Sequence, residues 1–233
     1  MTSAPGDPFP WQEPRKSVVR GAFIVVEGVD RAGKTTQVQR VCSKLYALGH
    51  NIKSIRFPDR SSTIGQMINS YLENETNLDD HVVHLLFSAN RWEKATWIEE
   101  TLSKGYTIIC DRYYYSGMVY SAAKNNPTLS LEWAKQPDIG LPKPDIVVFL
   151  DLEPWQAEQR GGYGEEKYEK REMQQRVREL YLDQLKAPDG RMRIINAGDS
   201  VDAVEERIWK EVLPSVDMVE GGTCGSKVEK FEG

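Results

Sequence analysis

Several features that would define a class of protein are scarce in this chain. Cysteine occurs only three times in 233 residues, at Cys42, Cys110 and Cys224, and the spacing is not that of metal ligands. An odd number of unclustered cysteines excludes a disulfide framework and a cysteine zinc site as organising features. Cys110 ends an apolar segment and is expected to be a small core residue.

Long apolar runs are also missing. No segment approaches the roughly 18 residues that cross a bilayer, and the N-terminus has no apolar secretory core. The net charge of -5 lacks the positive excess with which proteins that coat nucleic acid neutralise phosphates. We therefore expect a soluble cytoplasmic protein that could also enter the nucleus, with neither a membrane nor a nucleic acid as partner. A small anionic ligand in a local basic pocket remains compatible with this charge.

The apolar pattern alternates between strands and helices along the chain. Strands are expected near 23–26, 51–57, 106–110, 145–152 and 192–196, and helices near 34–48, 61–74, 78–104, 113–124, 129–135, 153–160, 168–186 and 200–213. Every crossover is long enough to be helical and right-handed. The sequence therefore predicts an α/β fold, a five-stranded parallel sheet with helices on both faces, that binds ligands at the carboxyl ends of its strands.

The two ends of the chain differ in composition from its centre. Residues 1–20 carry four prolines and few aliphatic residues, which predicts a flexible extension that Trp11 could anchor. Residues 214–233 are rich in glycine and are expected to form a flexible tail. One domain is predicted between them, at 21–213.

A glycine-rich phosphate cradle follows the first strand. Gly28, Gly33, Lys34 and Thr35 fit the pattern Gly-x4-Gly-Lys-[Ser/Thr], in which backbone N–H groups wrap a polyphosphate. The lysine reaches the outer phosphates, the hydroxyl ligates Mg²⁺, and a helix N-terminus adds partial positive charge. Arg31, Ala32 and Thr36 complete the predicted phosphate-binding segment.

Two residues of the cradle, Asp30 and Arg31, are unusual there. A carboxylate near phosphates is unfavourable unless it contacts a sugar hydroxyl or a cation. Arg31 is placed to stabilise a phosphoryl group in flight, as an arginine finger within the chain. The structural alternative is that Asp30 and Arg31 pair with each other at the surface.

Other charged residues follow neighbouring strands and should share the same rim. Arg112 is a candidate phosphate clamp, and Asp111 could hold Mg²⁺ through water. Arg60 adds a further arginine. A GTPase is disfavoured because the chain lacks the Asn-Lys-x-Asp motif for guanine. The three histidines receive structural roles, because an acceptor that is itself a phosphate is already ionised at pH 7.

The long helix at 78–104 has two distinct faces. One stripe is apolar and is predicted to face the core: Leu78, Val82, Leu85, Ala89 and Trp92. The opposite side carries Val83, Phe87, Asn90, Arg91 and Lys94, an unusual set for a solvated face. The structural alternative is a helix between two layers, with Phe87 in ordinary packing and Arg91 in a surface ion pair.

Taken together, these motifs resemble the thymidylate kinase family. The resemblance spans about 22–213. It rests on Gly-Val-Asp-Arg-Ala-Gly-Lys-Thr-Thr (28–36), Phe-Pro-Asp-Arg (57–60), Leu-Leu-Phe-Ser-Ala-Asn-Arg-Trp-Glu (85–93), Asp-Arg-Tyr (111–113) with Ser116-Gly117, and the connection Gln-Pro-Asp-Ile-Gly-Leu-Pro-Lys-Pro-Asp at 136–145.

The resemblance implies transfer of the ATP γ-phosphate to dTMP with Mg²⁺, a step in dTTP synthesis, by a homodimer with the P-loop nucleoside monophosphate kinase fold. By the same resemblance, Phe87 would stack on thymine, Arg91 would hydrogen-bond a thymine carbonyl, and Asp30 would contact the 3′-hydroxyl. Arg60 and Arg112 would hold the acceptor phosphate. The remaining dTMP-binding residues that it implies are Phe57, Asn90, Ser116, Gly117, Tyr120 and Tyr168, of which Tyr120 would crowd the 2′ position.

A lid at about 161–168 is implied as well. Arg31 in the cradle places the chain with the style of eukaryotic members, and Arg160 at the root of the lid would lie against adenine. Two alternatives stay open on the residues: another pyrimidine nucleoside or nucleoside monophosphate kinase, or a nucleotide-binding protein without turnover. Intact Lys34, Arg31 and Arg112 argue against the second.

Overall fold

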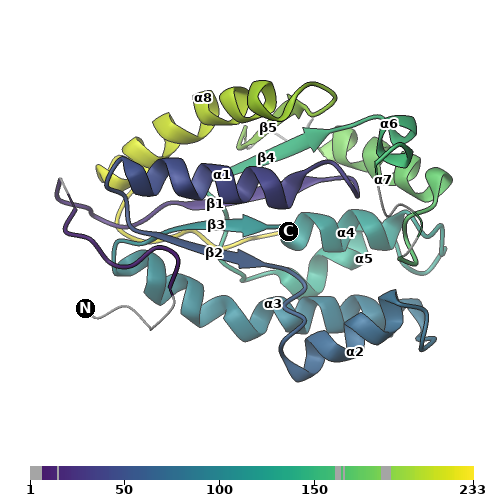
Figure 1. The fold of residues 1–233 in the computed structure, drawn as a ribbon. Helices are drawn as coiled ribbons and strands as arrows, with labels where there is room; N and C mark the ends of the chain where they lie inside the picture. Colours follow the sequence, from purple (N-terminus) through teal and green to yellow (C-terminus); the bar gives the residue numbers. More distant parts are fainter. Residues whose placement is uncertain (1–6, 15, 161–163, 165, 185–189) are drawn as a thin grey trace.

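The computed structural model describes residues 7–14, 16–160, 164, 166–184 and 190–233. Within these residues, five parallel strands form one sheet in the order β2-β3-β1-β4-β5 (Figure 1). The strands are β1 (Phe23–Gly28), β2 (Ile52–Arg56), β3 (Thr107–Asp111), β4 (Ile146–Asp151) and β5 (Met192–Asn196). The predicted fold class is confirmed, and the strand order reverses beside β1, where such sheets open a crevice for ligands.

Helices cover both faces of the sheet. They are α1 (Lys34–Ala47), α2 (Thr63–Leu72), α3 (Asp80–Ser103), α4 (Tyr114–Ala122), α5 (Leu131–Lys135), the 3-10 turn η1 (Gln136–Asp138), α6 (Pro154–Glu158), α7 (Arg171–Gln184) and α8 (Val201–Glu220). α1 and α8 pack on one face and α3 on the other (Figure 1).

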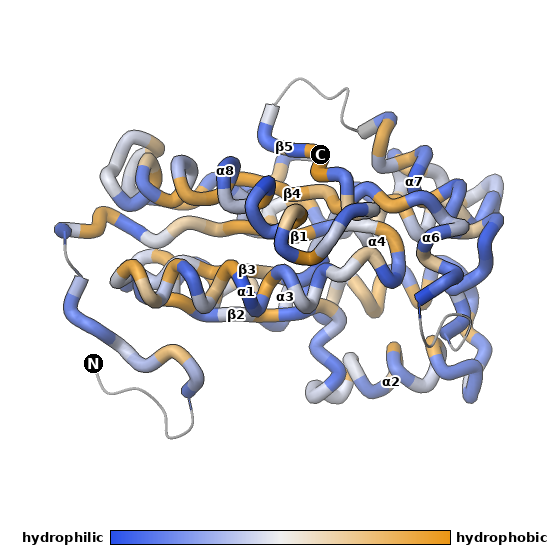
Figure 2. Tube along the Cα trace, turned by 45° about the horizontal axis from the view of Figure 1, so that its top comes forward, coloured by the Kyte–Doolittle hydropathy of each residue, from blue (hydrophilic) through white to orange (hydrophobic). Residues whose placement is uncertain are grey.

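The central strand β1 joins the two halves of the core. Ile24 and Val26 pack with α1 and α8, whereas Phe23 and Val25 pack with α3. All six residues of β1 are buried, as expected for a parallel strand covered on both faces. Figure 2 shows β1 and β4 as largely hydrophobic segments inside a more hydrophilic periphery. Among the described residues, no helix is both long and apolar enough to cross a membrane.

The predicted orientation of α3 is wrong. Val82, Leu85 and Trp92 of the apolar stripe are 47%, 47% and 42% exposed, while Asn90 and Arg91 on the opposite side are buried. Arg91 can be buried because Asp138 neutralises it, with 2.7 Å between Nη2 and Oδ2. Helical periodicity identifies two faces, but the pairing of a charge decides which face turns inward.

Both ends of the chain pack more closely than the sequence predicts. Phe9 contacts Tyr46, and Trp11 contacts Tyr106 edge-on with 5.0 Å between ring centroids, as an anchor would. α8 continues past Pro214 to Glu220, because its buried face still packs on the core beyond the proline. The segment after α8 lies along residues 140–143, where Phe231 stacks on Tyr114 at 4.3 Å between centroids. These contacts differ from the flexible tail expected at 214–233.

Candidate active site

A cavity of about 680 Å³ lies at the carboxyl ends of the strands. Residues from the β1–α1 loop, α1, α3, β3, α4 and the β2–α2 connection line it, together with Arg160, Glu166, Tyr168 and Glu169. It brings together all the predicted site residues except Gly28 and Asn90: Asp30, Arg31, Ala32, Gly33, Lys34, Thr35, Thr36, Phe57, Arg60, Phe87, Arg91, Asp111, Arg112, Ser116, Gly117, Tyr120, Arg160 and Tyr168. Sequence positions more than 130 residues apart therefore share one site.

The cradle depends on unusual backbone conformations. Gly28 and Gly33 have φ of 153° and 90°, and Arg31 has φ of 62°. A Cβ at Gly28 would lie 2.7 Å from the carbonyl oxygen of Leu150, so this position excludes any side chain. α1 begins at Lys34 without a side-chain cap. Its first N–H groups are thereby available to an anion.

Lys34 lies deep in the cradle. Its Nζ donates to the carbonyl oxygen of Val29 at 2.7 Å. Burial lowers the pKa of Lys34 to about 7, and repulsion from Arg112 adds to the shift. A polyphosphate beside this amine would favour its charged form.

Thr35 and Asp111 meet at the edge of the cradle. The Thr35 hydroxyl donates to Asp111 Oδ2 at 2.6 Å. The other oxygen, Oδ1, is buried without a hydrogen-bond partner among the described residues. A buried carboxylate oxygen needs a proton donor or a cation, so this pair of hard oxygen ligands fits Mg²⁺.

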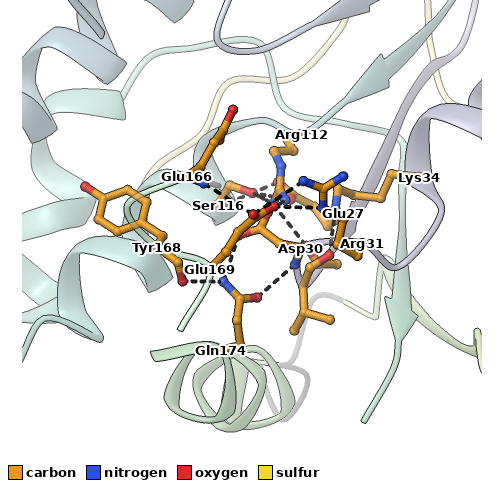
Figure 3. Close-up of polar contacts among 12 residues, drawn as sticks. Glu27, Asp30, Arg31, Lys34, Arg112, Ser116, Glu166, Tyr168, Glu169 and Gln174 are labelled. Carbon is orange, nitrogen blue, oxygen red and sulfur yellow. Dashed lines mark hydrogen bonds and ion pairs between the residues drawn. The ribbon is translucent and has the colours of Figure 1, made fainter. Parts of the chain in front are cut away.

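The arginines of the rim pair with carboxylates of other segments (Figure 3). Asp30 pairs with Arg112, and not with Arg31 as the structural alternative had it. Arg31 Nε donates to Glu169 at 2.8 Å. Burial opposes ionisation of Asp30, but the charges of Arg112 and Lys34 hold its pKa below the usual value.

Arg60 is paired in the same manner. Its Nη2 lies 2.6 Å from Glu166 Oε1, and its Nη1 donates to Asn69 at 2.7 Å. Both carboxylates that face Arg31 and Arg60 therefore come from residues that follow the predicted lid glycines. Residues 161–163 and 165 of that predicted lid lie outside the described residues.

The unusual face of α3 forms one wall of the cavity. Phe87 and Arg91 line it, and Asp138 accepts from both Arg91 Nε and Nη2, at 3.0 and 2.7 Å. Gly117 approaches so closely that a Cβ there would lie 2.7 Å from Arg91 Nη2. Asn90 instead binds the β2–α2 connection, since its Oδ1 accepts from the backbone N–H of Asp59 at 2.7 Å. The structure therefore does not place Asn90 among the residues that line the cavity, contrary to the prediction.

Aromatic residues close the other sides. Phe57 lies 5.6 Å from Tyr113 between ring centroids, and Tyr120 lies 5.7 Å from Tyr168. The guanidinium of Arg112 sits over the Tyr120 ring at 5.3 Å. Arg160 donates to the carbonyl oxygens of Arg31 and Ala197, at 2.6 and 3.0 Å, on the side of the cavity formed by the cradle.

Several polar residues of the site were not predicted. Gln174 has no exposed surface and binds both the backbone N–H and the carboxylate of Asp30, at 2.8 and 2.7 Å. Glu27, Asp138 and Glu169 are also buried partners of site residues. Asp138 belongs to the 136–145 connection noted in the sequence, but nothing in a single sequence marks the other three.

This geometry defines a class of protein. One cavity at the edge of a parallel α/β sheet contains a phosphate cradle, several arginines and an aromatic wall large enough for a nucleobase. Phosphotransferases of the nucleoside monophosphate kinase fold combine these features. The family model of thymidylate kinase matches residues 26–208. The chain belongs to the thymidylate kinase family.

Individual relatives agree with this assignment. The chain is 50% identical to the thymidylate kinase of Arabidopsis thaliana over 84% of this chain and 73% of the relative. It is 47% identical to that of Homo sapiens over 81% and 88%. A solved structure of the thymidylate kinase from Candida albicans, 42% identical, superposes with a TM-score of 0.75 over 82% of this chain and 90% of that one.

Proposed function

We propose that the protein phosphorylates dTMP to dTDP by direct in-line transfer from ATP, a step in dTTP synthesis. The observation that carries the proposal is that one cavity joins the phosphate cradle to the Phe87–Arg91 wall, and the Asp30–Arg112 ion pair lines the same cavity. The cradle fits a polyphosphate donor. An aromatic face beside a guanidinium fits a planar base with carbonyl oxygens.

The donor side holds ATP. The N–H groups of the cradle and Lys34 would bind its phosphates, and Arg160 would lie near adenine. Arg31 would stabilise the transferring phosphoryl group, for which it must exchange Glu169 for phosphate oxygens. Thr35 would ligate Mg²⁺, and Asp111 would hold it through water. When bound, this ion would neutralise charge on the phosphates.

The acceptor side holds dTMP. Phe87 would stack on the base, Arg91 would hydrogen-bond a thymine carbonyl, and Phe57, Ser116 and Gly117 would bound the base pocket. Arg60 and Arg112 would bind the acceptor phosphate, Asp30 the 3′-hydroxyl, and Tyr120 would occupy the space of a 2′-hydroxyl. Tyr168 would close over the nucleotide. The second ionisation of the acceptor phosphate, near pH 6, leaves a charged oxygen at pH 7, so the reaction needs no general base.

A panel assay tests this function. The protein is incubated with ATP, Mg²⁺ and one of dTMP, UMP, CMP, AMP or thymidine, and ADP release is followed. We expect the fastest release with dTMP, and a clear preference for another monophosphate would reject the proposal. Faster turnover with thymidine would indicate a nucleoside kinase, and ATP binding without any ADP release would indicate a protein without turnover.

We also propose that two copies of the chain form a homodimer through α3. The stripe that contains Val82 and Leu85 is exposed in the single chain, and exposed apolar surface on a rigid helix favours association with a second copy.

A cytoplasmic and partly nuclear location is proposed as well, because dTTP is consumed where DNA is made. Imaging of a fluorescent fusion tests it, and confinement to another compartment would reject it.

A further inference from the structure

A buried carboxylate at the end of β1 has no part in the chemistry described so far. Glu27 directly precedes the first glycine of the cradle and has no exposed surface. Burying a carboxylate is costly unless its oxygens receive hydrogen bonds. Glu27 accepts four of them: from the backbone N–H of Tyr113 (2.9 Å) and Ser116 (3.2 Å), and from the hydroxyls of Ser116 (2.6 Å) and Tyr181 (2.8 Å).

Two of these bonds supply the N-terminal cap of α4. The residue before the helix, Tyr113, makes no side-chain cap of its own. Glu27 provides both the missing acceptor and a negative charge at the positive end of the helix dipole. The residue just before Tyr113 is Arg112, whose φ of 68° is left-handed and unfavourable for a side chain of this kind. The cap therefore holds a strained turn in place.

The other bonds lead to the guanidinium of Arg112 (Figure 3). The Ser116 hydroxyl donates to Glu27 and accepts from Arg112 Nη1 at 3.1 Å. The same Nη1 donates to the carbonyl oxygen of Gly28, the neighbour of Glu27, at 3.0 Å. Nη2 is directed to Asp30. Glu27 thus fixes the backbone next to Arg112 through the N–H of Tyr113. It also orients the Ser116 hydroxyl that accepts from Arg112 Nη1.

We propose that Glu27 is a positioning residue, which orients Arg112 toward the acceptor phosphate without touching a substrate. The inference rests on the phosphate-binding role proposed for Arg112. When Asp30 binds the sugar hydroxyl, the bond to Ser116 would be the remaining side-chain hydrogen bond that orients the guanidinium, which also lies over the Tyr120 ring. Orientation of a charged donor within a fraction of an ångström is what separates productive from unproductive binding.

Glu27→Gln tests the proposal. Glutamine has the same volume as glutamate, but one carboxylate oxygen becomes an NH₂ group. This NH₂ group would face the Ser116 and Tyr181 hydroxyls, which donate to Glu27 in the parent protein. We expect kcat/KM for dTMP to fall about tenfold or more, with KM for ATP changing less than about threefold, because the effect passes through an acceptor contact. Glu220→Gln is the matched control. Glu220 is a buried carboxylate that accepts from Thr107 at the opposite end of the sheet, so its loss should lower Tm and leave the kinetics unchanged.

A double-mutant cycle shows whether the effect passes through Arg112. In an Arg112→Lys background, Glu27→Gln should reduce kcat/KM much less than in the parent enzyme. Full additivity would overturn the proposal, as would unchanged kinetics in Glu27→Gln alongside a lowered Tm. If Glu27→Gln does not fold, Ser116→Ala removes the hydroxyl link and keeps the backbone cap. Because Ser116 also lines the proposed base pocket, the test is its coupling to Arg112: Ser116→Ala should raise KM for dTMP less in an Arg112→Lys background than in the parent, and full additivity or wild-type kinetics would overturn the proposal.

The cycle also separates this inference from the proposals on which it rests. An Arg112→Lys variant with full activity would reject the phosphate-binding role of Arg112, and the positioning role with it. A parent protein that phosphorylates another monophosphate in preference to dTMP would instead reject the proposed function, whatever Glu27→Gln does.

Discussion

Arg31 occupies a position where the backbone itself is unfavourable for a long side chain. Its φ of 62° and its bond to Glu169 hold the guanidinium at the mouth of the cradle. Strained residues persist where the surrounding structure determines them, and they cluster at functional sites. The conformation is therefore consistent with the arginine-finger role, which requires a donor that is in place before the charge develops.

Arg31→Ala should lower kcat roughly 10³-fold, because an arginine finger acts mainly in the transition state. The Kd for ATP should change much less. Steady-state kinetics and equilibrium titration with ATP measure the two effects. Arg171→Ala is the control, since Arg171 is a surface arginine, with a side chain 67% exposed, that lies outside the cavity. A defect in ATP binding with unchanged kcat would contradict the role.

His84 is the histidine on which stability should depend. Burial, with repulsion from Arg91, lowers its pKa to about 4, and its Nδ1 is 2.7 Å from the Ser121 hydroxyl. The unfolded chain takes up this proton near pH 6.5, whereas the folded protein does so only near pH 4. Since the unfolded state binds more protons between these values, the free energy of unfolding decreases as the pH falls through that range.

His84→Gln should flatten this dependence by up to about 1.4 kcal/mol per pH unit. Denaturant titrations at pH 7.5, 6 and 5 measure it. The control is His81→Gln, because His81 is a half-buried histidine whose pKa is raised by the Thr128 carbonyl and Asp79. That variant should not flatten the curve. An equal slope in His84→Gln and the parent would show that His84 does not titrate in this manner.

At the scale of elements, α3 shows where sequence reasoning succeeds and where it stops. The 3.6-residue period correctly separates an apolar stripe from a face with Phe87 and Arg91. It cannot show that Asp138, 47 residues after Arg91, neutralises the guanidinium and lets the polar face turn inward. The resemblance places Asn90 among the dTMP-binding residues, whereas its Oδ1 accepts from the backbone N–H of Asp59.

Leu85→Glu should convert the proposed dimer into a monomer, because it places a charge in the centre of the exposed stripe of α3. Analytical ultracentrifugation measures the mass. Met218→Glu is the matched control, since Met218 is 51% exposed on α8, on the opposite face of the sheet. A parent protein that sediments as a monomer, or a Leu85→Glu variant that remains a dimer, would contradict the assignment of this face.

At the scale of the whole molecule, local signals were sufficient for the sheet and for the cradle. Gly28 to Thr35 could be recognised because a short contiguous pattern specifies both the turn and its ligand. The partners of Arg31, Arg60 and Arg112 could not be predicted, because each lies far away in sequence and any carboxylate can serve. The packed segment after α8 was missed because its composition is that of a loop and its order comes from tertiary contacts alone.

That segment should contribute to stability. Phe231 stacks on Tyr114, and its backbone N–H and carbonyl bond to Leu141 and Gly140, at 2.9 and 2.8 Å. Phe231→Ala should therefore lower the free energy of unfolding by about 2 kcal/mol, which is less than for a fully buried phenylalanine. Denaturant titration measures it against Glu232→Ala, a neighbouring exposed position. Equal midpoints for the two variants would mean that the stack contributes nothing.

Each of the three rim arginines is paired with a carboxylate that a bound phosphate could replace. Glu169, Glu166 and Asp30 already neutralise Arg31, Arg60 and Arg112 before any nucleotide enters. In the proposed function, incoming phosphates would replace these carboxylates, and the free energy gained would be the difference between two sets of similar contacts. When the products leave, the carboxylates would return to the same cations. A site built in this way would gain less from charge alone and would depend more on the fit of the nucleotide to the cavity.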